Sequence, residues 1–150
     1  MKDIADQLRS IINIYSPRLT SIPGSEFEIK PLPNKWSKKE ILGHLVDSAQ
    51  NNARRFVVAQ YENSPLIEYD QDKWVSISHY QSYHSSDLIQ VWILLNRHIC
   101  RILEHMPPET VTRTCKTGHA EEHTLEWIAK DYVRHLMHHL NQILPPANSY

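Results

Sequence analysis

Apolar side chains recur at intervals of three and four residues in separate stretches of the chain, and this spacing is typical of amphipathic helices. The stretches predict helices at residues 2–16, 37–60, 86–106 and 124–143. Prolines follow the first, third and last of them at Pro17, Pro107 and Pro145, where each is expected to end a helix. The pattern therefore predicts an all-α fold, with four helices in a single domain over residues 1–150.

Local signals mark where the predicted helices begin. Ser37 and Glu40 have the spacing of a capping box, in which each side chain satisfies a free backbone N–H group of the other residue. Thr124 is a plausible N-cap for the last helix. These signals support the predicted starts of the second and fourth helices.

Two connections separate the later helices. Residues 61–84 form a long connection that contains Tyr69, Trp74, Tyr80 and Tyr83, and a long aromatic connection in a small domain is often a lid or a pocket wall. The polar residues 107–123 are expected to form no more than a turn or two.

Composition excludes several classes of function. The formal net charge is −1 without a basic patch, which argues against a nucleic-acid partner. The longest purely apolar run, Val91 to Leu95, is far too short to span a membrane. No signal peptide is recognised, so Cys100 and Cys115 are interpreted as free thiols of a cytoplasmic protein, and neither has the surroundings of a nucleophile.

The chain contains 10 histidines, and two of them share a helix face. His135 and His139 lie one turn apart on the inward face of the fourth predicted helix, whereas His138 points elsewhere. Two imidazoles at positions i and i+4 can bind one metal ion without strain. Residue 136 is Leu, so the glutamate of an HExxH metalloprotease motif is missing.

A third histidine lies at a matching depth in the second predicted helix. His44 is about 10 Å along the axis from the Ser37 cap, and the pair in the fourth helix is about 9 Å before Ile143. If the two helices are antiparallel, the three histidines lie at one level. Three histidines on one ion leave a coordination position open, which is typical of catalytic sites. Hydrogen-bonded or solvated histidines are the alternative interpretation.

Other side chains are weaker candidates for the site. Asp47 follows His44 by one turn and could support a ligand, although a solvated helix residue is equally consistent. Asn51 continues the same face, and Trp74 could form part of a pocket wall. Trp36 and Trp92 are expected in the core rather than in a pocket.

Two segments resemble the signatures of a known family. Residues 36–47 (WSKKEILGHLVD) and 135–143 (HLMHHLNQI) are similar to those of the DinB-like, YfiT-like superfamily of metal-dependent hydrolases. The resemblance implies a four-helix bundle of up-down-down-up topology that is often a homodimer. It also implies one divalent metal ion, zinc or nickel, on His44, His135 and His139. Better-known relatives transfer low-molecular-weight thiols such as bacillithiol, or use mycothiol in an isomerisation.

Three functions remain open from the sequence. The leading hypothesis is a metal-dependent S-transferase that joins a bacillithiol-type thiol to small electrophiles, because a metal favours the nucleophilic thiolate. The second is a hydrolase that uses metal-bound water. The third is a protein of the stress response that binds a metal or a small molecule without turnover.

Overall fold

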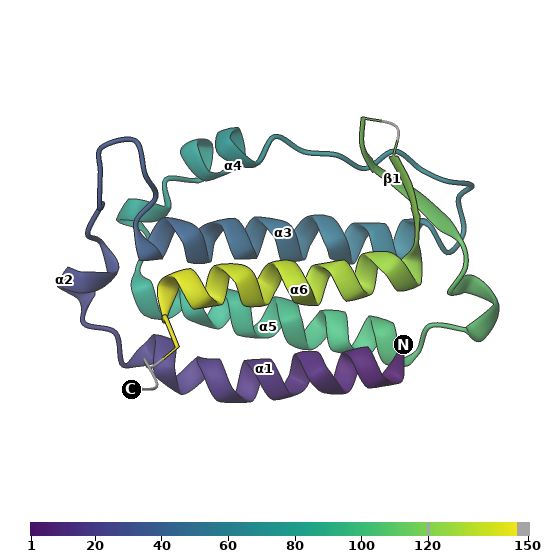
Figure 1. The fold of residues 1–150 in the computed structure, drawn as a ribbon, viewed down its shortest axis with the longest axis horizontal. Coiled ribbons are helices and arrows are strands. Elements are labelled where there is room, and N and C mark those ends of the chain that lie inside the picture. The colour runs from purple at the N-terminus through teal and green to yellow at the C-terminus, as the bar shows by residue number, and fades with distance from the viewer. Residues whose placement is uncertain (120, 147–150) are drawn as a thin grey trace.

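The long helices of the protein form a bundle (Figure 1). The computed structural model describes residues 1–119 and 121–146. Its long helices are α1 (Lys2–Thr20), α3 (Lys38–Val58), α5 (Ser85–Glu104) and α6 (Leu125–Ile143). Its shorter elements are α2 (Gly24–Phe27), α4 (Gln71–Ser78), the 3₁₀ turns η1 (Tyr80–Ser82) and η2 (Pro108–Thr110), and the strands β1 (Thr114–Gly118) and β2 (Glu121–Thr124).

The directions of the long helices confirm the expected topology. In Figure 1, α1 and α6 run one way along the bundle and α3 and α5 run the other way, which is the up-down-down-up order. Each of α1 and α3 packs along α5, and α3 also packs along α6. Because α3 and α5 are parallel neighbours, residues 59–84 must travel back along the whole bundle, and α4 and η1 form within this crossing.

The inward faces of the helices form the core. Leu8, Leu42, Trp92 and Leu125, one from each long helix, are completely buried, as the spacing of apolar positions predicted. Burial of each such side chain contributes about 1.5–3 kcal/mol relative to leaving it exposed. Within the described residues, no helix combines the length and the apolar character that crossing a bilayer requires.

The first helix is longer than its sequence signals predicted. Pro17 was expected to end the helix, but α1 continues through it to Thr20. A proline in the last turn removes only one backbone hydrogen bond, to the carbonyl of residue i−4. Leu19, one turn beyond the core residue Tyr15, is buried, and its burial offsets that loss.

The polar residues after α5 form more than the expected turns. Strands β1 and β2 pair antiparallel, with Thr114 opposite Thr124. A part of the crossing between α3 and α5 also pairs with β1. The N–H of Lys116 donates to the carbonyl of Pro65 at 2.9 Å, and Leu66 forms a parallel β-bridge with Lys116. This pairing joins segments that are about fifty residues apart, and no local pattern in the sequence predicts it.

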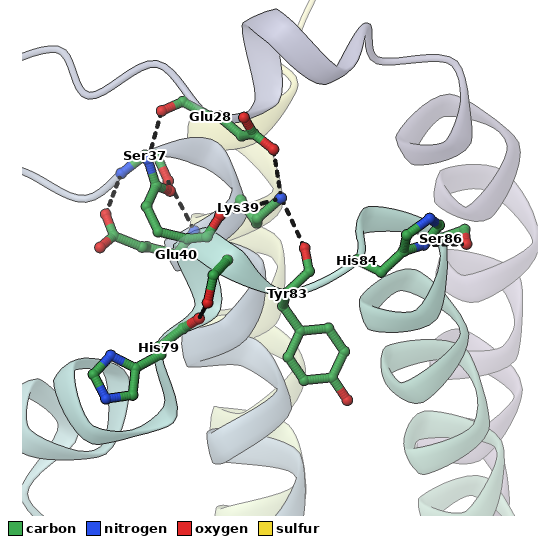
Figure 2. A network of polar contacts seen from close by, with 10 residues as sticks. Glu28, Ser37, Lys39, Glu40, His79, Tyr83, His84 and Ser86 are labelled. Atoms are coloured by element: carbon green, nitrogen blue, oxygen red, sulfur yellow. Dashed lines mark hydrogen bonds and ion pairs between the residues drawn. The ribbon is translucent and has the colours of Figure 1, made fainter.

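The N-terminal end of α3 is fixed by polar contacts. The predicted capping box is present, since the Ser37 hydroxyl accepts from the N–H of Glu40 and the Glu40 carboxylate accepts from the N–H of Ser37. The buried ammonium of Lys39 donates to Glu28 at 2.7 Å and to the carbonyl of Tyr83 at 2.8 Å (Figure 2). These contacts attach both flanking loops to the helix that carries His44.

Candidate metal centre

Three histidines meet between the antiparallel helices α3 and α6. His44 comes from α3, while His135 and His139 lie on successive turns of α6. The Nε2 atoms of His44 and His135 are 3.2 Å apart, and one ring nitrogen from each of the three side chains lies within 4.8 Å of the other two. The structure therefore brings together the three side chains that the sequence selected.

The spacing of these nitrogens fits the requirements of a metal ion. Zinc–nitrogen bonds of about 2.0–2.1 Å place two ligands of a tetrahedral ion about 3.3 Å apart. The separation of 3.2 Å between His44 and His135 is close to this value. Imidazole nitrogens suit zinc, nickel and copper better than they suit magnesium or calcium, which prefer oxygen ligands.

The surroundings keep the imidazoles neutral, as metal binding requires. Burial, together with the neighbouring His135 and His139, lowers the pKa of His44 to about 3. Burial and the proximity of His139 lower the pKa of His135 to about 4. The pKa of His139 is also lowered, chiefly by burial. At neutral pH each ring therefore keeps a lone pair for coordination.

Gln142 sets the orientation of His139. The Nδ1–H of His139 donates to Oε1 of Gln142 at 2.8 Å, which leaves the lone pair on Nε2 free. The amide nitrogen of Gln142 lies 3.2 Å from Nε2 of His138. His138 is exposed and is not part of the cluster, as predicted. Gln142 lies three residues after His139 and seven after His135, and this spacing places it on the same face of α6 as the two histidines.

Cavities adjoin the cluster at both of its α6 residues. A cavity of about 270 Å³ lies beside His135, and Arg55 and Tyr69 form part of its wall. Another cavity, of about 450 Å³, lies beside His139, with Trp36 in its wall. A small molecule can therefore approach the histidines from two sides.

The weaker site candidates from the sequence have other contacts. Asp47 is buried, accepts a hydrogen bond from the Tyr80 hydroxyl, and has its pKa raised to about 6 by burial. Asn51 donates to the backbone carbonyl of Asp47 at 2.9 Å, within the helix. Trp74 packs edge-on against Tyr69, with ring centroids 5.4 Å apart, and is absent from the walls of both cavities. Among these side chains, Tyr69 rather than Trp74 reaches the site.

Trp36 lies nearer the site than its expected core position implied. Its ring is only partly buried and its centroid is 5.0 Å from that of His44. It directly precedes the Ser37 cap, so it sits at the end of the bundle where the histidines meet. Trp92, in contrast, is completely buried in the core, as predicted.

Arg55 is a site residue that the sequence interpretation missed. It lies eleven residues after His44 in α3, which is about three helical turns and hence the same face of the helix. Its side chain is 8% exposed and lines the cavity beside His135. The helical spacing from His44 is the signal that could have identified it.

Comparisons with known proteins agree with this arrangement. The family model described as the DinB superfamily matches residues 7–143. A protein of Oceanobacillus iheyensis, named as a candidate metal-dependent hydrolase, is 31% identical over an alignment of 114 residues that covers 72% of this chain. The chain spans only 63% of the length of that protein.

Solved structures share the fold. YfiT from Bacillus subtilis, described as a candidate metal-dependent hydrolase with an unusual four-helix bundle topology, superposes with a TM-score of 0.83 at 22% identity, over 95% of this chain and 83% of that chain. A mycothiol-dependent maleylpyruvate isomerase superposes with a TM-score of 0.79 at 12% identity, over 95% of this chain and 60% of that chain.

Proposed function

The chain belongs to the DinB superfamily, and on this premise we propose that it is a metal-dependent enzyme that transfers a low-molecular-weight thiol of the bacillithiol type to small electrophiles. The observation that carries the proposal is the cluster of His44, His135 and His139, whose ring nitrogens lie within 4.8 Å of one another next to two cavities. Three ligands leave space for a co-substrate, which is the pattern of a catalytic site.

His44, His135 and His139 would hold one divalent ion, zinc or nickel. When bound there, such an ion would favour the thiolate form of a co-substrate thiol and so supply the nucleophile. Gln142 holds the ring of His139 in the tautomer that coordination requires. His44 is completely buried, so water is kept away from its side of the cluster, which strengthens electrostatic interactions there.

The two cavities offer separate places for two reactants. The cavity beside His139 is the larger, at about 450 Å³, and has the indole of Trp36 in its wall. We assign the thiol to this cavity because it is more open to a flexible molecule. The electrophile would occupy the cavity of about 270 Å³ beside His135.

Hydrolysis is the second candidate function. It is favoured by the names of the relatives from Oceanobacillus iheyensis and Bacillus subtilis, both described as candidate metal-dependent hydrolases. The same three histidines would serve this reaction, with water in place of the thiol. The two candidates differ in whether turnover requires a thiol.

A thiol-dependence assay tests the proposal. The purified chain, loaded with zinc or nickel, is mixed with monobromobimane and either bacillithiol, cysteine or no thiol, and formation of the conjugate is followed by fluorescence. We expect the protein to accelerate thiol conjugation above the spontaneous reaction of the same thiol, and we expect this acceleration to be lost in His44→Ala. Thiol-independent cleavage of an ester panel by the same preparation would instead support hydrolysis, and inactivity in both assays would favour a binding protein without turnover.

A further inference from the structure

The guanidinium of Arg55 is buried without a carboxylate beside it. It donates from Nε and Nη2 to the carbonyl of Ile67 at 3.0 and 2.8 Å, and from Nη2 to the carbonyl of Thr117 at 3.2 Å. Its Nη1 donates to Oδ1 of Asn52 at 3.3 Å. All of these acceptors are neutral, so the positive charge itself has no partner in contact with it among the described residues.

One donor of this guanidinium is unused. A guanidinium carries five N–H groups, and the contacts to Ile67, Thr117 and Asn52 use four of them. The remaining N–H belongs to Nη1, and Arg55 lines the cavity of about 270 Å³. A buried cation that lacks a counter-charge costs free energy, and an anion in the cavity would reduce that cost.

Nearby carboxylates do not fill this role. The carboxylate of Asp131 forms its ion pair with Arg134 rather than with Arg55. It therefore stabilises the charge of Arg55 only from a distance. Glu121 lies 3.5 Å from His123, and its side chain is largely exposed. Both acids line the same cavity, so they would repel a ligand that carries several negative charges. The charge distribution favours a ligand with a single negative charge.

The rest of the wall is suited to a small organic acid. Ser48 and Tyr69 contribute polar side chains to the same wall as Arg55, and Trp127 and Ile128 contribute apolar surface. Arginine is the side chain best suited to binding carboxylates, through charge-assisted hydrogen bonds. His135 lines the same cavity, so a ligand held by Arg55 would extend towards the histidine cluster.

We infer that this cavity binds the carboxylate of a small monocarboxylic acid, with Arg55 as the cationic partner and the Tyr69 hydroxyl as a further donor. The role of this carboxylate binding in turnover rests on the proposed function, because the remainder of the acid would carry the electrophilic centre beside His135. The binding itself does not depend on a metal, so the two proposals can be tested separately.

A purely structural role for Arg55 is the competing explanation, since the side chain attaches the crossing and β1 to α3. Arg113 provides a matched control for that role. It binds the backbone carbonyls of Ala59 and Glu62 at 2.7 and 2.9 Å, but it is absent from the cavity wall. Arg113→Met therefore removes a comparable attachment without changing the charge at the cavity.

The test compares benzoate with the neutral benzamide on the full chain, first without metal and then loaded with zinc. Binding is followed by the NMR shift of the Trp127 indole, a group in the cavity wall. We expect benzoate to bind about tenfold more tightly than benzamide, as one charge-assisted contact implies. Arg55→Met should remove this preference, and Arg113→Met should retain it.

A second variant covers the case in which Arg55→Met does not fold. Tyr69→Phe removes only the hydroxyl and should reduce the preference for benzoate about threefold. Equal binding of benzoate and benzamide by the unmodified chain would overturn the inference. Benzoate binding that requires zinc and survives Arg55→Met would also overturn it, because the metal would then hold the carboxylate. Failure of the chain to take up zinc would contradict the proposed function and leave the metal-free comparison intact.

Discussion

The side chain of Gln142 accepts a hydrogen bond from Nδ1 of His139 at 2.8 Å, one turn further along α6. The same amide contacts His138 through its other end, at 3.2 Å. Gln142 thus bonds His139 through Nδ1 and His138 through Nε2, so only His139 keeps Nε2 free, and only His139 of the two belongs to the cluster. Adjacent histidines on one helix are thereby given different chemical roles.

His139→Ala should abolish tight metal binding while the chain stays folded. Loss of one imidazole leaves two protein ligands, too few to hold zinc or nickel firmly against water. The fold should remain because the buried faces of the long helices supply most of its stability. Elemental analysis after dialysis measures the bound metal, and circular dichroism measures the helix content.

His138→Ala is the matched control for this substitution, since it removes an exposed imidazole one position away. It should leave the metal content unchanged. Loss of metal in His138→Ala but not in His139→Ala would contradict the assignment of the ligands. Gln142→Ala is expected to weaken metal binding about 10–100-fold, the usual effect of removing a hydrogen-bond partner of a ligand.

The lowered pKa values predict how metal binding and stability respond to acid. Because the pKa of His44 is about 3 and that of His135 about 4, protons should compete with the metal for these two imidazoles only well below pH 6. Without metal, the unfolded chain takes up protons near pH 6.5 while the folded chain does not, so the free energy of unfolding should fall from pH 6.5 towards pH 4. Metal titrations and urea unfolding at pH 7.5, 6 and 5 would measure both effects. A large loss of metal affinity between pH 7.5 and 6.5 would show that the imidazoles titrate in their usual range.

Gly43→Ala should destabilise the chain by about 1–3 kcal/mol, the usual cost of overpacking. A Cβ at this position would lie 2.1 Å from Cδ2 of the Tyr80 ring, which is held in place by its hydrogen bond to Asp47. This clash should outweigh the gain of up to about 1 kcal/mol that alanine brings to a helix. Gly24→Ala is the control, because no atom lies within 4 Å of its added Cβ. Urea denaturation would compare the two, and equal stabilities would contradict the close packing of Tyr80.

Lys39→Met should cost about 1–3 kcal/mol, because it removes the buried ammonium that donates to Glu28 and to the carbonyl of Tyr83. Lys38→Met, at the neighbouring position, removes only a surface ion pair with Glu26 and should cost no more than about 1 kcal/mol. Thermal unfolding of the two variants under one set of conditions measures the difference. A smaller effect at Lys39 than at Lys38 would refute this role for the buried ammonium.

We also propose that the chain is a homodimer, as the family resemblance implied. The crossing presents exposed apolar side chains, Tyr61, Leu66 and Ile77, that could contribute to an interface. Light scattering at tens of micromolar should give twice the mass of the chain, and Ile77→Asp should lower that mass. A monomer at this concentration would contradict the proposal.

The long helices and the ligand histidines could be predicted from the sequence because their signals are local. A helix face is read from spacing alone, so Leu8, Leu42, Trp92 and Leu125 could be assigned to the core from apolar periodicity. The capping box at Ser37 depends on residues within one turn, and it forms as predicted. Positions i and i+4 on α6 likewise placed His135 beside His139.

Other features of the fold depend on contacts between segments that are distant in sequence, and no local pattern predicts them. The strand β1 pairs with residues 65–67 of the crossing as well as with β2, and Pro17 stays inside α1 because Leu19 is buried beyond it. The position of Arg55 in a cavity wall depends on carbonyls of the crossing and of β1. The sequence by itself determined the helices and the histidines that can share an ion, since spacing along one helix defines its faces. Only the folded chain determined the surroundings of those histidines, because each cavity wall combines segments that are distant in sequence and meet through packing.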